Sequence, residues 1–420
     1  MSKKGIFVAH HIFILSFYFG VIGIFASTSA IGIHHLLMLL GATLFYYQDK
    51  KNVFASFKQV FLNKSFLFLT LFSISIILSV LSNQSSIDNP YKWAMKFKYF
   101  FIAVFSLPAI LKIKWNVQSL KRLIYFCFFV VMMANISGFW GYHFGHNFLK
   151  PSGSITPDRL SGLNGMVLTY SHNLSFMNIL LLGYLFHYRK LSTLIPLNRT
   201  LCVFIFLVNC ICLYLSATRG AWLSLLIAIP FLYFSISGFK KWAFGSFIYL
   251  LSIFIFGSLS TNLKNEFAGE KRMDSNTQRV AFFKAALYAF KENPVLGVGY
   301  KQFELNVENI KKKYDIEWED KFGHAHNNFL EHFASLGIFG GLSFILFSLF
   351  WFLEASRIKT PEGFLLMAFC VCLAVSGMTQ YTFGDAENSV FIMLAWLLSM
   401  YLYTYKSSGK KSWTGTYSLR

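Results

Sequence analysis

Apolar residues fill long continuous windows along most of this chain, and short polar segments separate them. A bilayer core needs about 20 apolar residues in a helix, and only a helix pairs its own backbone over that length in lipid. The pattern therefore predicts an all-α polytopic membrane protein, a single membrane domain over residues 1–420 with about twelve transmembrane helices. The predicted spans are 6–27, 31–47, 65–81, 97–111, 123–142, 166–187, 201–215, 222–236, 242–259, 328–352, 364–378 and 390–405.

One connecting segment, 260–325, is far longer than the others and is predicted to be a large periplasmic loop between transmembrane helices 9 and 10. Within it, "SNTQRVAFFKAALYAFKENP" predicts a helix that Ser275 or Asn276 would cap. "KQFELNVENIKKKYDIEWEDKF" predicts a second, more polar helix, and the pair would lie on the outer membrane surface. The residues that recur at helical spacing in the first helix are Val280, Phe283, Leu287 and Phe290.

Composition and charge support the membrane class and exclude a nucleic-acid partner. The chain is 55% hydrophobic and 13% charged, whereas soluble proteins average about 25% charged residues. Its net charge of +20 comes from lysines and arginines concentrated in alternate polar segments. This distribution places the N-terminus in the cytoplasm by the positive-inside rule. The six cysteines fall inside predicted spans, so the sequence indicates neither a disulfide framework nor a zinc site.

Three segments far apart in the sequence place unusual groups on the outer side of the predicted bundle. "SATRGAWL" puts Arg219 at the start of a helix, "NTQRVAFF" puts Arg279 on the first loop helix, and "HAHNNFLEH" puts His326 where a span begins. Guanidinium groups bind phosphate oxygens in pairs, and a helix N-terminus favours anions. The alternatives are an arginine that reaches to lipid headgroups, an ordinary basic surface residue and a structural interfacial histidine.

Eleven residues, about three helical turns, separate His326 from Gly337. The spacing predicts that the histidine lies above this glycine on one helix face. Gly337 and Gly341 form a small-xxx-small pair, which would let another helix or a lipid chain approach closely. The alternative is a histidine that is hydrogen-bonded to a loop.

Other polar and aromatic residues on the outer side are weaker candidates. Asp385, in "FGDAENS", could contact an acceptor or the loop arginines. No metal and no cofactor are expected, because the acidic "DIEWED" stretch (315–320) fits a solvated helix end better than a metal site. The aromatic residues that could stack on sugars, or that belong to the interfacial aromatic belt, are Trp140, Tyr142 and Tyr381.

The motifs together resemble those of the bacterial O-antigen ligase superfamily, which includes O-antigen ligases, O-antigen polymerases and protein O-oligosaccharyltransferases. "HNNFLEHFASLGIFGG" fits His-Asn, nine residues, then Gly-x-x-Gly. "TRGAWL" resembles the family's arginine turn, and "QRVAFFKAALYAFKENPVLGVGY" resembles its periplasmic stretch, in which an arginine precedes a helix ending in Pro-x-x-Gly-x-Gly. The resemblance covers roughly residues 155–345, and it implies a fold like that of type C membrane glycosyltransferases.

The resemblance implies an inverting, metal-independent transfer of a glycan from undecaprenyl diphosphate to a hydroxyl at the periplasmic face of the bacterial inner membrane. By family correspondence, Arg219 and Arg279 would bind the diphosphate and His326 would be the general base. Asn327 would orient the imidazole, and His324 is a second candidate base. Arg159, in "PDRLSG", resembles a family arginine that would hold acceptor phosphate or sugar; a loop-stabilising pair with Asp158 is the alternative.

An O-antigen ligase that acts on lipid A–core oligosaccharide is the first interpretation. A polymerase that joins lipid-linked repeat units is the second, and one polymerase class carries Arg-x10-Gly motifs. That motif is absent here, because the residues eleven positions after Arg159, Arg219 and Arg279 are Tyr170, Pro230 and Phe290. Protein O-glycosylation remains open. A transporter or flippase is less favoured, because charged residues collect at one face and not at span centres.

Overall fold

The computed structural model describes residues 3–113, 115–148, 158–259, 270–317 and 323–407. Within these ranges, eight helices are long and apolar enough to cross a membrane, and two shorter apolar helices accompany them. The predicted all-α polytopic class is confirmed, and the count of twelve spans stays a prediction. The helices that build the bundle are α1 (Lys3–Phe25), α2 (Thr28–Gln48), α4 (Lys64–Ser82), α6 (Lys98–Ile110), α7 (Val117–Phe144), α8 (Val167–Phe186), α10 (Arg199–Leu215), α11 (Arg219–Leu259), α15 (Asn328–Arg357), α16 (Pro361–Thr379) and α17 (Ala386–Ser407).

Two predicted spans, 222–236 and 242–259, lie in the single helix α11. The indole Nε1 of Trp242 donates a hydrogen bond of 2.8 Å to the carbonyl oxygen of Pro230. Residues twelve apart on a straight helix would be separated by about 18 Å. The chain therefore bends back on itself between these two residues, which keeps the two apolar windows distinct.

Helix α8 is the polar centre of the bundle, and buried asparagines tie it to its neighbours. Asn209 of α10 donates to the Oδ1 of Asn178 in α8 at 3.1 Å, and it accepts from Asn135 of α7 at 2.7 Å. The hydroxyl of Tyr170 in α8 donates to Asn135 at 2.6 Å. Because α8 is buried on most of its faces, it tolerates polar residues that a lipid-facing helix would not.

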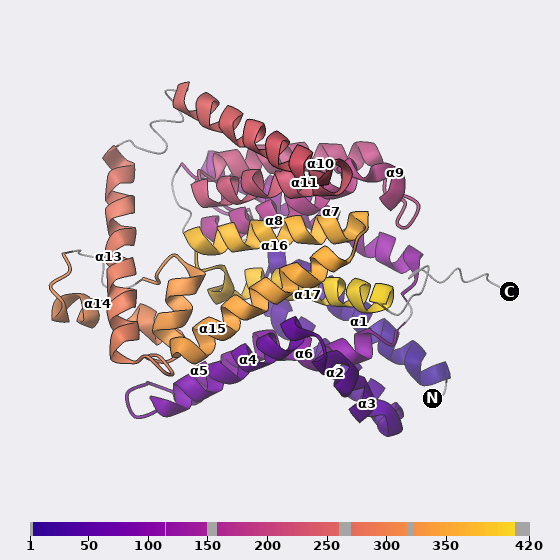
Figure 1. The fold of residues 1–420 in the computed structure, drawn as a ribbon, viewed down its shortest axis with the longest axis horizontal. Helices are drawn as coiled ribbons and strands as arrows, with labels where there is room; N and C mark the ends of the chain where they lie inside the picture. Colours follow the sequence, from indigo (N-terminus) through magenta and orange to yellow (C-terminus); the bar gives the residue numbers. More distant parts are fainter. Residues whose placement is uncertain (1–2, 114, 149–157, 260–269, 318–322, 408–420) are drawn as a thin grey trace.

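The connecting segments divide between two sides of the bundle. Figure 1 shows the start of α1, the end of α17, α3 (Val53–Phe61) and α9 (Tyr188–Leu191) on one side, and α13 (Glu270–Glu292) and α14 (Gln302–Lys313) on the opposite side. Helix α13 lies across the ends of the membrane helices (Figure 1). The division agrees with the sidedness that the lysine and arginine distribution predicts.

The structure corrects two predictions about the loop helices. Helix α13 begins at Glu270, before the predicted caps, and α14 ends at Lys313, before the end of the predicted segment; residues 318–322 lie outside the described residues. The predicted apolar face is also wrong, because Val280 and Leu287 are half exposed. A neighbouring face is buried instead, and its small residues let α13 pack closely on α14 and α15. That face consists of Phe282, Ala285, Ala286 and Ala289.

Helix α15 is broken at Gly337, whose φ of 64° and ψ of −162° are accessible essentially to glycine alone. The loop between α13 and α14, residues 294–299, fills the break. Four backbone hydrogen bonds join the two segments, two on each side of the glycine. They run from the Val298 N–H to Ala334 O (3.0 Å), from the Gly299 N–H to Ser335 O (3.0 Å), from the Ile338 N–H to Pro294 O (2.7 Å) and from the Phe339 N–H to Val295 O (3.3 Å).

This junction, the Gly337 break, contradicts the prediction that His326 lies above Gly337 on one helix face. Helix α15 starts only at Asn328, so His326 lies outside it. The helix is also interrupted at Gly337, so this glycine does not continue the helix face that begins at Asn328. The close approach at Gly337 comes from the loop, because an added Cβ would lie 2.3 Å from the carbonyl oxygen of Val295. An added Cβ at Gly297 (φ 69°) would lie 2.3 Å from the carbonyl carbon of Ser335. Both backbones therefore require glycine at the contact.

Gly337→Ala is expected to destabilise the folded protein by at least about 2 kcal/mol, because alanine is strained at this φ and its Cβ overlaps the Val295 carbonyl. Thermal unfolding in detergent or nanodiscs measures the effect. Gly32→Ala is the matched control, since nothing lies within 4 Å of its Cβ position. Equal unfolding temperatures for the two variants would contradict the role given to the break.

Candidate functional site

A pocket of about 180 Å³, called the arginine pocket below, lies at the end of the bundle nearest α13. It gathers three arginines and two histidines from five separate segments of the chain. The predicted residues Arg219, Arg279, His326 and Arg159 all line it. The full lining is Arg159, Leu168, His172, Ala217, Thr218, Arg219, Gly220, Gln278, Arg279, His326, Thr379 and Gln380.

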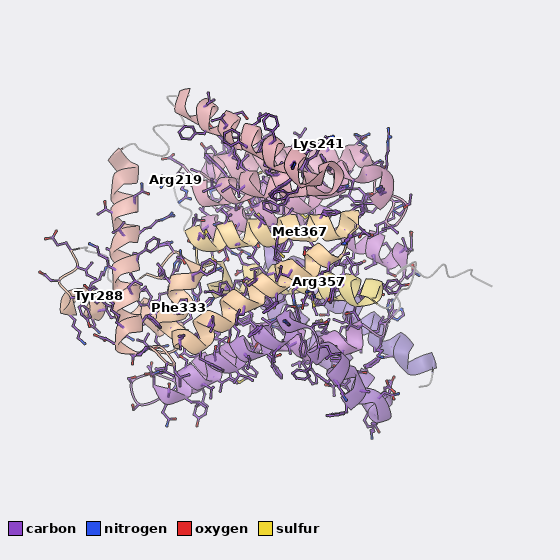
Figure 2. All side chains as sticks on the ribbon, viewed as in Figure 1. Arg219, Lys241, Tyr288, Phe333, Arg357 and Met367 are labelled. Carbon is purple, nitrogen blue, oxygen red and sulfur yellow. The ribbon has the colours of Figure 1, made fainter. Side chains whose placement is uncertain are left out.

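Arg219 is the first residue of α11, as the sequence predicts, and Figure 2 shows it at the end of the bundle that faces α13. The turn before it holds Ala217 at φ 49°. Gly220 allows close packing on the last turn of α16, because an added Cβ would lie 2.3 Å from the Oγ1 of Thr379. The start of α11 and the end of α16 therefore form one wall, with the guanidinium of Arg219 at its rim.

Arg279 lies on the face of α13 that turns toward the pocket. Asn276, Arg279 and Phe282 are spaced three residues apart, so they share one side of the helix. One terminal nitrogen of Arg219 donates to the Oδ1 of Asn276 at 3.3 Å. The ring of Phe282 lies 6.0 Å from the imidazole of His326. Helix α13 thus borders the pocket and brings the second guanidinium into its lining.

Arg159 is anchored in the turn that precedes α11. Its Nε donates to the carbonyl oxygen of Ser216 at 2.9 Å, and one terminal nitrogen donates to the Oγ1 of Thr218 at 3.0 Å. Thr218 in turn donates to the hydroxyl of Ser171 in α8 at 3.0 Å. These contacts fix the arginine relative to both α8 and α11, so a third positive charge lines the same pocket.

His326 precedes α15 in a left-handed conformation, with φ 47°. Its Nδ1 lies 2.8 Å from the Oε1 of Gln380. An amide oxygen only accepts, so Nδ1 carries the proton in this arrangement and Nε2 keeps a free lone pair. The neutral imidazole is thereby set up to accept a proton from a molecule in the pocket.

Burial and the charge of Arg279 favour the neutral form of this imidazole. Burial lowers the pKa of His326 below its ordinary value; the hydrogen bond that the imidazole donates to Gln380 raises it and the charge of Arg279 lowers it. His324 lies beside it, with ring centroids 4.2 Å apart, and its Nδ1 accepts the backbone N–H of His326 at 3.1 Å. Burial, followed by the charge of His326, lowers the pKa of His324 well below the ordinary value.

Asn327 caps a helix and does not orient the imidazole as the sequence reasoning expected. Its Oδ1 accepts the backbone N–H groups of Phe329 and Leu330 at 2.9 and 3.1 Å, and its Nδ2 donates to the carbonyl oxygen of Met378 at 3.2 Å. The residue that orients His326 is Gln380. Asn327 fixes the start of α15 against the end of α16, and this contact sets the position of His326, the preceding residue.

Three further candidates do not line the arginine pocket. Asp385 accepts a hydrogen bond of 2.8 Å from the Oγ1 of Thr169, so its carboxylate is directed at α8 and not at the loop arginines as predicted. Burial raises its pKa above the ordinary value. Gly337 lies in the break of α15 against Val295. Tyr381 is fully buried, so it has no exposed face on which a sugar could stack.

Sequence reasoning missed Gln380 and Thr379, which line the pocket beside His326. The sequence did contain a signal for these two residues, namely their position along the chain. They belong to "MTQYT", which follows the eleventh predicted apolar window and so lies on the same side of the membrane as the arginines. His172, which lies in the predicted span 166–187, also lines the pocket, and its Nδ1 lies 3.0 Å from the hydroxyl of Ser376.

Metal ligands are not clustered in the part of the chain that the structure describes, where no group of three or more His, Cys, Asp or Glu side chains could hold an ion. Residues 318–320 of the acidic stretch lie outside that part. What the described site offers an anionic ligand is positive charge from arginines, together with a neutral imidazole.

The fold and this pocket define a multi-pass α-helical membrane protein with a basic, histidine-containing site at one end of its bundle. Residues 201–345 match a family model described as O-Antigen ligase. The match confirms the predicted resemblance to the O-antigen ligase superfamily, and the matched residues include Arg219, Arg279 and His326. A search of curated proteins found no match.

Two substitutions are expected to move the pKa of His326 in opposite directions. Arg279→Gln removes a nearby cation and should raise it, whereas Gln380→Leu removes a hydrogen bond to the imidazole and should lower it. Titration of the isotopically labelled histidines by NMR measures both shifts, with the His326 signal assigned by its loss in His326→Asn. Shifts in the same direction would contradict the geometry described here.

Proposed function

We propose that this protein is an O-antigen ligase. It transfers polysaccharide from undecaprenyl diphosphate to a sugar hydroxyl of lipid A–core oligosaccharide, at the periplasmic face of the bacterial inner membrane. The observation that carries the proposal is the arginine pocket, in which guanidinium groups from two helices lie beside a neutral histidine. The family match over residues 201–345 supports the same class of lipid-linked glycan substrate.

The arginines suit a diphosphate leaving group. When the bond between the anomeric carbon and the phosphate oxygen breaks, negative charge accumulates on the diphosphate. Arg219 and Arg279 can each offer two N–H groups to its oxygens, and Arg159 adds a third charge at the same wall. Because the charge is supplied by guanidinium groups, the reaction is expected to continue in the presence of a metal chelator.

The histidine suits the acceptor. A sugar hydroxyl that attacks the anomeric carbon must lose its proton, and Nε2 of His326 is the nitrogen left free by Gln380. The new bond forms from the acceptor oxygen to the anomeric carbon as the diphosphate leaves on the opposite side, so the anomeric configuration inverts. His324, whose ring lies 4.2 Å away, is the second candidate base.

A lipid tail has a matching groove next to the arginine pocket. Between α15 and α16 lies an apolar cavity of about 180 Å³ that begins at Asn328 and Gly377 and continues toward Leu349 and Phe352. Asn328 and Gly377 are two and three residues from the pocket residues His326 and Gln380. The polyprenyl chain of the donor would lie in this groove while its diphosphate occupies the arginine pocket.

The test is transfer by the purified full-length protein in nanodiscs, supplied with polyprenyl-diphosphate polysaccharide and rough lipopolysaccharide in EDTA, without ATP. The expected product is lipopolysaccharide that carries the polysaccharide with the anomeric configuration inverted. Longer lipid-linked glycans with no change in lipopolysaccharide would instead identify a polymerase, and movement of the donor across the membrane without transfer would identify a flippase.

His326→Ala is expected to abolish transfer while membrane insertion and donor binding remain, because the base is lost and the diphosphate site is intact. His326→Asn is the companion variant, since asparagine tolerates the left-handed conformation of this position. His143→Ala, an exposed histidine at the end of α7 outside the pocket, serves as the control. Normal transfer by both His326 variants would remove this residue from the mechanism.

Arg219→Lys is expected to lower kcat about 10²-fold or more, because an ammonium group keeps the charge but cannot present the paired N–H groups that the diphosphate needs. Steady-state transfer kinetics provide the measurement. The matched control is Arg189→Lys in α9, on the opposite side of the bundle. Unchanged kinetics for Arg219→Lys would indicate that this arginine holds lipid headgroups instead.

A further inference from the structure

A second pocket, of about 280 Å³ and called the lysine pocket below, lies near the start of α14. One wall comes from the segment before α6, with α5 (Pro90–Ala94) and η2 (Met95–Phe97), and the other comes from the start of α14 and from the link to α17. The proposed mechanism does not use this pocket. The lining residues that the argument needs are Trp93, Lys96, Tyr99, Tyr300, Lys301 and Glu304.

The lysine pocket combines aromatic rings with both signs of charge. Nζ of Lys301 lies 3.4 Å from a carboxylate oxygen of Glu304, and both side chains are partly exposed. Nζ of Lys96 lies 5.4 Å from the centre of the Tyr99 ring, and this ammonium group is close enough to Lys98 and Lys301 for mutual repulsion. An anionic ligand would relieve that repulsion.

This lining is typical of a carbohydrate site. The ammonium groups can donate to hydroxyl, phosphate or carboxylate oxygens, and Glu304 can accept from sugar hydroxyls. The half-buried ring of Trp93 offers an apolar face on which the C–H face of a sugar can pack. A purely apolar lipid chain would leave the repulsion at Lys96 unrelieved, and a bare phosphate would not contact the apolar face of Trp93.

The lysine pocket is joined to the arginine pocket through one buried side chain, Tyr381. The ring of His324, the neighbour of His326, lies 5.7 Å from the ring of Tyr381, and Nζ of Lys301 lies 4.9 Å from the centre of the same ring. The short link after α16 also lines both sites, with Thr379 and Gln380 in one and Phe383 and Gly384 in the other. The two pockets are therefore neighbours, with His326 and His324 on the path between them.

The Gly337 break fixes their relative position. Lys301, held at φ 64°, follows Val298 and Gly299, whose amides bond to α15. His326 directly precedes the cap of the same helix. A single rigid element thus sets the distance from the lysine of one pocket to the imidazole of the other.

We propose that the lysine pocket binds an anionic sugar of the acceptor oligosaccharide, a few sugar units away from the hydroxyl that reacts. This inference rests on the proposed function and names the part of its acceptor that is recognised. The lysine pocket is the neighbour of the arginine pocket across Tyr381 and His324, so a donor diphosphate held by the arginines leaves the lysine pocket to the acceptor.

The test uses two variants of the full-length protein in nanodiscs, Trp93→Leu and Lys96→Gln, because each removes one type of contact. Lys312→Gln is the matched control, since this lysine of α14 is exposed, pairs with Glu308 and lies outside the pocket. Both variants are expected to bind rough lipopolysaccharide about tenfold more weakly and to raise its KM to the same extent. The KM of the polyprenyl-diphosphate donor, and kcat at saturating acceptor, should stay at the wild-type values.

Three results would overturn the assignment. Acceptor binding within about twofold of wild type in both variants would leave the lysine pocket without a role in recognition. An increase in the donor KM alone would assign the pocket to the donor glycan. Equal competition by vesicles of phosphatidylglycerol would make it a lipid headgroup site. The binding measurement does not depend on turnover. A wild-type protein that binds rough lipopolysaccharide through this pocket but transfers no glycan would therefore refute the proposed function and leave the assignment of the lysine pocket intact.

Discussion

The backbone contact between the 294–299 loop and the break of α15 at Gly337 is the constraint on which the site depends. A membrane helix that loses its own hydrogen bonds must find other partners, because unpaired N–H and C=O groups cost several kcal/mol in an apolar surrounding. Here the loop supplies them on both sides of the glycine. The loop can replace the missing helix hydrogen bonds only because Gly297 and Gly337 lack side chains where the two backbones touch.

This constraint converts a long outer loop into a fixed part of the bundle. Because the loop connects α13 to α14, anchoring it on α15 holds α13 across the helix ends, with Phe282 beside His326 and Arg279 one turn earlier. The start of α11, packed on Thr379 through Gly220, brings Arg219 to the same place from the membrane side. Contacts between uncharged groups thus bring together guanidinium groups that repel one another. This repulsion favours the binding of an anionic ligand.

The fold class and the gathering of Arg159, Arg219, Arg279 and His326 at one side were readable from the sequence, because apolar windows, sidedness and the chemistry of arginine and histidine are local properties. Which face of α13 is buried could not be read from the sequence. Alanines that fit against a neighbouring helix occupy the buried face, and Val280 and Leu287 are half exposed. The break of α15 depends on hydrogen bonds from a loop distant in sequence, which no helical period reveals. Gln380 was missed for a similar reason, because only the folded chain brings it to the Nδ1 of His326.

The measurement that tests the central claim most directly is a structure of the full-length protein with a polyprenyl-diphosphate sugar bound. The account predicts that the two phosphates lie between the guanidinium groups of Arg219 and Arg279, with Nε2 of His326 facing the anomeric carbon and the lipid tail between α15 and α16. Phosphates bound instead at Lys96 and Lys301, with the arginine pocket empty, would contradict it.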